Sequence, residues 1–110
     1  MSLNWEDFEK TDMRVGTIIE AKMAEGLIKP AIRLVIDFGT LGIKRSSAQI
    51  TDYYEPEKII GKQVIAVVNF PPKQIGKFIS ECLVLGAVDG DGKVTLLQPE
   101  RSCANGLRIG

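Results

Sequence analysis

The feature that most constrains the fold is an apolar segment stopped by two prolines. Residues 63–70 read Gln-Val-Ile-Ala-Val-Val-Asn-Phe, and Pro71 and Pro72 follow directly. An apolar run of this length before prolines is typical of a buried β-strand, because proline cannot donate to a sheet ladder. Gly76 permits a positive φ angle, so we expect residues 69–81 to form a shaped loop between two strands.

Alternation of apolar side chains predicts another strand at residues 31–38. The side chains expected on its buried face are Ile32, Leu34, Ile36 and Phe38. Gly16 is expected to form a bulge or a bend in the first strand of the chain. The further strands are expected at residues 14–22, 43–50, 81–88 and 94–98.

Short helices and tight turns are expected between these strands. Asn4 can cap a helix that carries Trp5 and Phe8 on one face. Residues 51–61 predict a second short helix or turn that ends at a glycine. The run Asp-Gly-Asp-Gly at residues 89–92 is typical of a β-hairpin turn.

Together these elements predict a single domain over residues 1–110. Eleven glycines, five prolines and repeated Val, Ile and Leu runs favour strands over a helical bundle. Five strands, a short element between the third and fourth, and a final hairpin are typical of an OB-fold. We therefore expect an all-β, five-stranded OB-fold barrel with a short N-terminal helix and small terminal extensions.

The residue types argue against most catalytic chemistry. The chain has no histidine, so it can build neither a Ser-His-Asp triad nor the usual zinc sites. Its glycines form neither a phosphate-binding loop nor a dinucleotide fingerprint. We expect no enzyme activity, no metal and no cofactor.

Cysteine usage and hydropathy indicate the compartment. Cys82 and Cys103 lack metal-ligand spacing, and Cys82 lies in an apolar segment where a buried thiol behaves as a small hydrophobe. No apolar run approaches the ~20 residues that cross a bilayer, and no secretory signal precedes the domain. We expect a cytoplasmic protein without membrane insertion.

Positive charge is concentrated in the middle of the chain although the net charge is zero. Residues 44–77 hold six basic and three acidic side chains, whereas acidic residues prevail on both sides of that segment. The same segment contains the two prolines. The distribution favours a local footprint for a polyanion over a uniformly basic domain.

Four ordered motifs carry a resemblance to a known family. They are Asp-Met-Arg-Val-Gly-Thr-Ile at residues 12–18, Ile-Arg-Leu-Val-Ile-Asp-Phe-Gly at 32–39, Val-Val-Asn-Phe at 67–70 and Ser-Glu-Cys-Leu-Val-Leu at 80–85. The chain resembles the tRNA-binding domain family, which includes extensions of methionyl- and phenylalanyl-tRNA synthetases. The resemblance implies an OB-fold that binds tRNA without catalysis.

Residues 46–51, 64–72 and 105–110 also resemble the free-standing, chaperone-like members of that family. This likeness implies an alternative function, a chaperone related to protein export that binds unfolded peptide segments. Apolar pockets and exposed strand edges would then hold the polypeptide. The two functions do not exclude one another.

Cationic and hydrogen-bonding groups beside a sheet suit a polyanion with polar base edges. The resemblance implies that Arg33, Ser47 and the pair Ser80-Glu81 lie where the family binds its ligand. The chain differs from many family members in having Cys82-Leu83 after this pair. The complete candidate set is Arg33, Lys44, Arg45, Ser47, Asn69, Lys73, Lys77, Phe78, Ser80 and Glu81.

Several candidates have a second interpretation. Arg33 could be a solvated arginine, and Glu81 could form a surface salt bridge worth less than ~1 kcal/mol. Asn69 could cap the turn after its strand or read a base edge, because its amide both donates and accepts. Phe78 could stack on a base, worth ~1–3 kcal/mol, or pack in a core or dimer interface.

The strand at residues 63–70 is apolar on both faces. If Val64, Ala66, Val68 and Phe70 fill the barrel, the alternate side chains need a second cover. A symmetric homodimer is the leading explanation, and the alternative is that the terminal segments pack within their own chain. The residues expected in the dimer interface are Trp5, Phe8, Ile65, Val67, Leu107 and Ile109.

Overall fold

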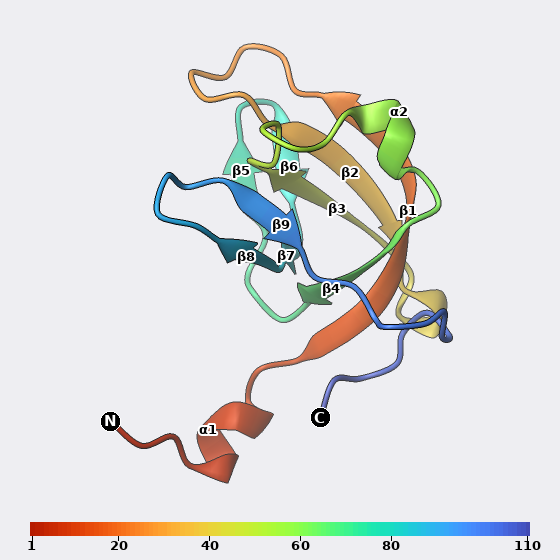
Figure 1. The fold of residues 1–110 in the computed structure, drawn as a ribbon. Coiled ribbons are helices and arrows are strands. Elements are labelled where there is room, and N and C mark those ends of the chain that lie inside the picture. Colours follow the sequence, from red (N-terminus) through yellow and green to blue (C-terminus); the bar gives the residue numbers. More distant parts are fainter.

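A curved five-stranded antiparallel sheet forms the body of the computed structural model, which describes residues 1–110. The sheet curls into a nearly closed barrel, which confirms the predicted all-β OB-fold (Figure 1). Its strand order is β3-β2-β1-β4-β7. These strands are β1 (Met13–Met23), β2 (Ile32–Asp37), β3 (Ile43–Ala48), β4 (Gln63–Val67) and β7 (Leu83–Val84).

The barrel interior is filled by the side chains that the alternating pattern assigned to it. Ile32, Leu34, Ile36 and Phe38 are all fully buried, and β4 contributes Val64 and Ala66 opposite them. Each such aliphatic or aromatic side chain stabilises the fold by roughly 1.5–3 kcal/mol relative to exposure. The alternation predicted for residues 31–38 is therefore confirmed.

Gly16 lies at the closest approach between β1 and the core, and the predicted bulge at this residue is wrong. The register of β1 with β2 shifts between Ile18 and Glu20 instead. A Cβ at residue 16 would lie only 2.6 Å from Ile36 Cγ2 and 2.7 Å from Phe38 Cε1. Glycine is required here because there is no room for a side chain, and its φ is not positive.

Two short helices flank the barrel as predicted. Helix α1 (Trp5–Glu9) starts at Asn4, whose side-chain oxygen accepts a hydrogen bond from the Asp7 backbone N–H at 2.8 Å. Helix α2 (Pro56–Ile59) lies between β3 and β4, buries Ile59, and is followed by a glycine with a φ of +92°. A 3-10 turn η1 (Gly39–Leu41) joins β2 to β3. None of these helices has the length and hydropathy to span a bilayer.

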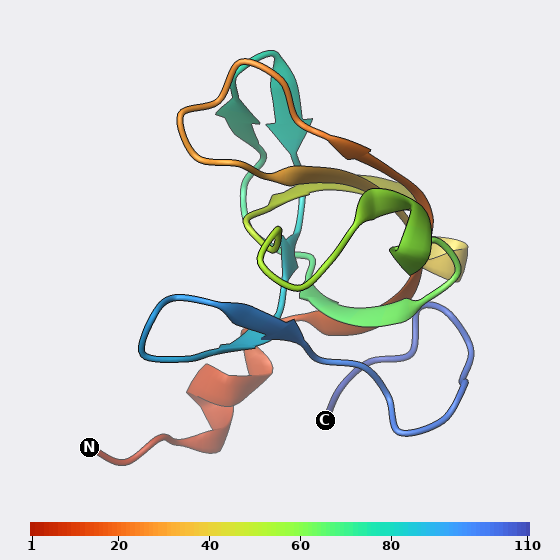
Figure 2. The same ribbon diagram turned by 45° about the horizontal axis from the view of Figure 1, so that its top comes forward.

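The segment after β4 contains more regular structure than the sequence indicates. Strand β4 ends at Val67, so Phe70 is 54% exposed and does not fill the barrel as expected. Beyond the two prolines, β5 (Lys73–Ile75) and β6 (Phe78–Ser80) form a hairpin that projects from the barrel (Figure 2). The predicted loop at residues 69–81 is thus largely a hairpin, turned by Gly76 with a φ of +63°.

The single strand predicted at residues 81–88 is divided in two. The chain changes partner at Leu85, whose N–H donates to Ile65 O while its C=O accepts from Leu97 N. Strand β8 (Gly86–Val88) then leaves the barrel and pairs with β9 (Val94–Leu96). The predicted turn between them is confirmed, since Asp89 Oδ1 accepts from the N–H groups of residues 91 and 93.

The two terminal segments behave differently. The C-terminal segment runs beside the start of β1, where Val15 N donates to Leu107 O at 3.0 Å and Ile109 N donates to Met13 O at 2.9 Å. Helix α1 buries no residue and stands away from the barrel (Figure 1). The C-terminal segment is therefore hydrogen-bonded to the barrel, whereas α1 buries no residue against it.

Candidate nucleic-acid interface

Three neighbouring strands carry the candidate residues on their outer face. The register places Lys22 of β1, Arg33 of β2 and Ser47 of β3 in one row across the sheet. The next row contains Val35 and Arg45. Side chains opposite one another in a sheet share a face, so both arginines and the serine point away from the core.

Phe78, from the β5–β6 hairpin, lies against these arginines. The guanidinium carbon of Arg33 is 5.1 Å from the centre of the Phe78 ring, and that of Arg45 is 5.6 Å away. A cation over an aromatic face is attracted to it by ~0.5–2 kcal/mol. Arg33 Nε is buried without a hydrogen-bond partner. The cluster of Arg33, Arg45 and Phe78 is called the arginine–phenylalanine cluster below.

Glu81 holds Arg45 in this cluster. The carboxylate oxygen Oε1 accepts from Arg45 Nε at 3.1 Å and from the Arg45 backbone N–H at 3.2 Å. Partial burial alone would raise the pKa of Glu81. The hydrogen bonds from Arg45 and the positive charges of Arg45 and Lys44 outweigh that effect and lower the pKa below its usual value. Glu81 is therefore ionised near neutral pH, and it orients Arg45.

Serine hydroxyls join the hairpin to the barrel. Ser80 Oγ accepts a hydrogen bond from the Ser47 backbone N–H at 3.3 Å.

Lys73 lies opposite Ser80 in the hairpin register, and Lys77 lies in the turn. Both lysine side chains are exposed and neither forms an ion pair. The hairpin therefore presents two free cations beside the arginine–phenylalanine cluster.

A second loop rises next to the hairpin. The loop between β1 and β2 and the β5–β6 hairpin project side by side from the same end of the barrel in both ribbon views (Figures 1 and 2). They touch where Leu27 Cδ2 would lie 3.4 Å from a Cβ placed on Gly76. Oligonucleotides bind OB-folds on the face between the corresponding loops.

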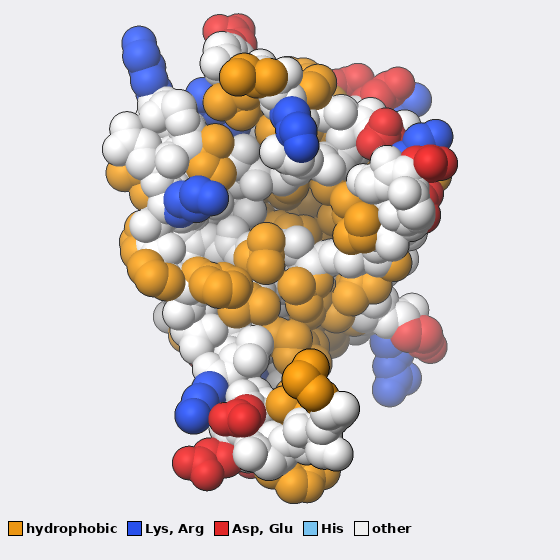
Figure 3. Space-filling view, turned by 90° about the vertical axis from the view of Figure 1, so that its left-hand side faces the viewer, with side chains coloured by type: hydrophobic (Ala, Val, Ile, Leu, Met, Phe, Trp, Pro, Cys, Tyr) orange, Lys and Arg blue, Asp and Glu red, His pale blue; other side chains and the backbone are white.

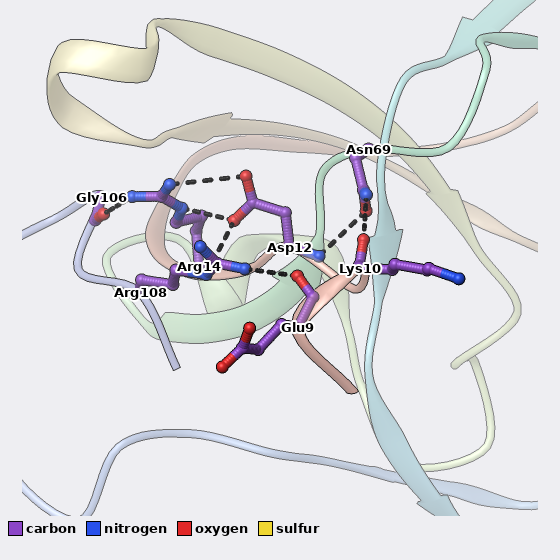
Figure 4. Close-up of polar contacts among 7 residues, drawn as sticks. All are labelled: Glu9, Lys10, Asp12, Arg14, Asn69, Gly106 and Arg108. Carbon is purple, nitrogen blue, oxygen red and sulfur yellow. Dashed lines mark hydrogen bonds and ion pairs between the residues drawn. The ribbon is translucent and has the colours of Figure 1, made fainter. Parts of the chain in front are cut away.

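Two candidates lie elsewhere. Lys44 alternates with Arg45 along β3 and so projects from the opposite face of the strand, although its charge still reaches Glu81. Asn69 lies at the base of the barrel, away from the cluster. Its Oδ1 accepts from Asp12 N at 3.1 Å and its Nδ2 donates to Lys10 O at 2.6 Å (Figure 4). The amide thus fastens the segment before β1.

The same region contains an ionic network that joins both terminal segments (Figure 4). Asp12 Oδ1 accepts from Arg14 Nε at 2.6 Å, and Arg14 also donates to Gly106 O at 3.0 Å. Arg108 donates to Glu9 O at 2.8 Å and lies near Asp12. The hydrogen bond from Arg14, opposed by partial burial and helped by the charges of Arg14 and Arg108, lowers the pKa of Asp12.

Beneath the hairpin lies an apolar pocket that the sequence did not reveal. It has a volume of about 290 Å³. Figure 3 shows hydrophobic side chains gathered around a hollow on the side of the molecule that carries β5–β9. The lining residues are Ser47, Phe70, Pro71, Lys73, Ile75, Ser80, Glu81, Cys82 and Leu83. The only sequence signal for it was the proline pair, which ends β4 early and leaves Phe70 outside the core.

Cys82 forms the floor of this pocket as the buried small hydrophobe that was expected. It is 5% exposed, and burial raises the pKa of its thiol to about 11. The thiol is therefore protonated near neutral pH. Cys82 and Cys103 are both free.

The residues expected in a dimer interface are only partly grouped. Trp5, Phe8 and Ile109 line a hollow of about 450 Å³ between α1 and the C-terminal segment. Trp5 is 79% exposed and its ring meets that of Phe8 edge-on at 6.3 Å. Leu107 is also exposed, Ile65 is half-buried, and Val67 is already buried within its own chain. Val67 therefore needs no second cover.

The family model of the tRNA binding domain matches residues 13–108 of this chain. The chain belongs to the tRNA-binding domain family. This confirms the resemblance that the four sequence motifs carried. The match includes every strand and the whole arginine–phenylalanine cluster.

Two solved structures match the whole fold. The chaperone CsaA of Bacillus anthracis has 53% identity and a TM-score of 0.95, and the match covers 100% of both chains. The CsaA chaperone protein of Picrophilus torridus has 52% identity and a TM-score of 0.91, covering 99% of this chain and 100% of that one.

Methionine–tRNA ligases contain a similar domain. The ligase of Porphyromonas gingivalis is 36% identical over 105 residues, or 96% of this chain. The chain spans only 15% of the length of that enzyme. The rest of the ligase lies outside the comparison.

Proposed function

We propose that this tRNA-binding-family domain binds structured RNA, tRNA foremost, without catalysing a reaction. The observation that carries the proposal is the Phe78 ring held against the guanidiniums of Arg33 and Arg45, between two projecting loops. A half-buried aromatic ring with cations beside it can take a stacked base and its phosphates together. Lys73 and Lys77 extend the cationic surface along the hairpin.

Local charge supports this function in a chain of zero net charge. Of the four candidate cations on this face, Arg33, Arg45, Lys73 and Lys77, only Arg45 is paired with an acid. Phosphate contacts dominate affinity for nucleic acids, and about four contacts predict a slope near −3 for log K against log salt. The 2′-hydroxyls and A-form shape of folded RNA favour it over duplex DNA.

Bulk tRNA should therefore bind the purified protein with an affinity that falls steeply with salt. Fluorescence anisotropy with labelled tRNA across a salt series measures the slope, and duplex DNA of similar length is the control. We expect a slope near −3 per protein copy and much weaker binding to the DNA. A flat salt response, or equal affinity for both nucleic acids, would contradict the proposal.

We further propose that the protein acts as a homodimer in which two copies cover each other's α1 helices. Trp5 and Phe8 remain outside the barrel, and an exposed apolar helix face next to a hollow is typical of an interface. Two copies would double the RNA contact area and offset the low charge of each one. The free cysteines suit the reducing cytoplasm, where we place this function.

If the protein is a homodimer, its mass in solution should be twice the 12.1 kDa of one chain. Sedimentation equilibrium should give this mass for the parent protein and the mass of one chain for the Trp5→Ser/Phe8→Ser variant. Because α1 buries no residue in its own chain, the variant should keep the thermal stability of its barrel. A parent protein that sediments as a single chain at every concentration would exclude this dimer.

A second candidate function is the holding of unfolded polypeptide segments. The specific observation is the exposed apolar surface around the pocket beneath the hairpin, where Phe70 is 54% and Leu83 48% exposed (Figure 3). Exposed apolar area on a small domain often marks an interaction site. The two similar solved structures are of CsaA chaperone proteins, which supports the same interpretation. If the protein takes part in protein export, we propose that it does so by holding such polypeptide segments.

A further inference from the structure

We propose that the pocket beneath the β5–β6 hairpin seats one large apolar side chain of an extended polypeptide, whose acidic neighbour contacts Lys73. The inference rests on the second candidate function, and it names the site and the kind of segment bound. It also predicts that the polypeptide and RNA exclude each other, because both use the same hairpin.

The size and walls of the pocket suit a single side chain. Its volume of about 290 Å³ lies at the lower limit of roughly 300–1,000 Å³ for pockets that hold a whole small ligand. Phe70, Pro71, Ile75 and Leu83 supply apolar walls, and the protonated thiol of Cys82 lies among them. Burying a leucine or phenylalanine side chain there would gain roughly 1.5–3 kcal/mol.

Several polar groups around the pocket are already engaged with one another. Ser80 Oγ accepts from Ser47 N and donates to Cys82 O, and Ser46 Oγ donates to the same carbonyl at 2.9 Å. The Glu81 carboxylate is held by two N–H groups of Arg45.

Three polar groups of the lining have no partner within the chain: the Ser47 hydroxyl, the second carboxylate oxygen Oε2 of Glu81 and the Lys73 ammonium. A base placed against the apolar walls of Phe70, Pro71, Ile75 and Leu83 would leave part of its polar edge without partners, at about 1–3 kcal/mol for each unpaired group. An apolar side chain has no such groups to satisfy. The apolar walls thus favour a hydrocarbon or an aromatic ring from a polypeptide, and the arginine–phenylalanine cluster outside the pocket stays available for a stacked base.

A neighbouring hollow indicates that the bound segment is extended. A second apolar hollow of about 400 Å³ shares Ser47 and Leu83 with the pocket and continues past Val84 to Val88. Side chains on one face of an extended chain recur every second residue, about 7 Å apart. Two adjoining hollows can receive two such side chains from one extended chain.

The charge at the pocket rim determines which residue of the bound peptide is favoured next to the seated apolar side chain. Lys73 and Glu81 are the only charged residues in the pocket wall, and Glu81 is paired with Arg45. Lys73 is exposed and unpaired, so the free charge at the rim is positive. A carboxylate beside the seated side chain would gain a contact, whereas a lysine there would be repelled.

Shared residues make the two ligands competitors. Ser47, Lys73, Ser80 and Glu81 line the pocket and also belong to the candidate RNA face. A polypeptide seated in the pocket would occupy Lys73 and block the approach of phosphates along the hairpin. Linkage requires the exclusion to be reciprocal, so tRNA should displace the peptide to the same extent.

The test uses labelled, unstructured peptides in a Gly/Ser background that differ at one central pair, Leu-Glu, Leu-Lys or Gly-Glu. Fluorescence anisotropy should show the Leu-Glu peptide binding at least tenfold more tightly than either of the others. Unlabelled tRNA should displace it. Equal binding of the three peptides would overturn the proposed pocket, and binding of both ligands together would overturn the exclusion.

Two variants tie the effect to this pocket. Leu83→Asp should lose tenfold or more in affinity for the Leu-Glu peptide, while Ile60→Asp, at a side chain 51% exposed outside the pocket, should lose nothing. Lys73→Glu should reverse the preference and bind the Leu-Lys peptide better than Leu-Glu. Because Lys73 is exposed, this reversal does not depend on any change in fold. An unreversed preference would overturn the role of Lys73.

The same experiment separates this inference from the functions on which it builds. If no peptide binds at all, the polypeptide-holding function fails together with the pocket. If peptides bind but Leu83→Asp binds them as well as the parent does, only the pocket assignment fails. tRNA affinity is measured on the same samples, so the RNA-binding proposal is judged independently.

Discussion

The Lys73→Glu/Lys77→Glu variant is expected to lose tRNA affinity by about a hundredfold, or ~2.7 kcal/mol. Both side chains are exposed and make no ion pair, so no contact within the chain is broken by the change. The substitutions remove two cations from the hairpin and add two anions beside Glu81. Phosphates near the arginine–phenylalanine cluster would then meet repulsion where they met attraction.

A matched charge reversal separates this local effect from a change in net charge. Lys58 and Lys62 lie at and after α2, outside the candidate face, and the Lys58→Glu/Lys62→Glu variant has the same net charge as the hairpin variant. We expect the control to bind tRNA within about threefold of the parent, since long-range effects are largely screened at physiological salt. Equal losses in both variants would show that net charge, rather than the hairpin, governs binding. Undiminished binding in the hairpin variant would remove Lys73 and Lys77 from the site.

Much of the barrel could be predicted because its signals are local. The alternation of Ile32, Leu34, Ile36 and Phe38 needed only the two-residue period of a strand. Asn4 and the turn at residues 89–92 were recognisable from side chains that bond to their own neighbours in sequence. The errors arose where distant segments decide the outcome. The division of residues 81–88 depends on Leu85 bonding to both Ile65 and Leu97, which no local pattern records.

The candidate site was predicted in composition but not in arrangement. Arg33, Arg45, Phe78 and Glu81 were all singled out, but the sequence could not indicate that Glu81 holds Arg45 or that Phe78 meets both arginines. These partners lie more than 30 residues apart in the chain, and the ion pair between Arg45 and Glu81 joins residues 36 positions apart. Asn69 was assigned both possible roles, and its hydrogen bonds to residues 10 and 12 favour the structural one.

Gly16→Ala is expected to destabilise the fold by roughly 2 kcal/mol. The new Cβ would lie within 2.8 Å of three atoms of Ile36 and Phe38, both fully buried and unable to turn towards solvent. Overpacking of a tight core costs about 1–3 kcal/mol. The loss of unfolded-chain entropy offsets about 0.5 kcal/mol of that. The thermal midpoint should therefore fall by about 10 °C, as measured by circular dichroism.

Gly90→Ala is the matched control for this substitution. A Cβ at residue 90 meets no atom within 4 Å, and its φ is not positive. The same chemical change should then leave stability within ~0.5 kcal/mol of the parent or raise it slightly. If both variants have the same thermal midpoint, Ile36 and Phe38 can repack around the new Cβ. The close contact of β1 with the core would then not explain the glycine. If only Gly16→Ala melts early, the glycine is required for space. A glycine required for space cannot then be told from a glycine required for a bulge by the local sequence alone. The distinction depends on the position of Phe38 across the barrel.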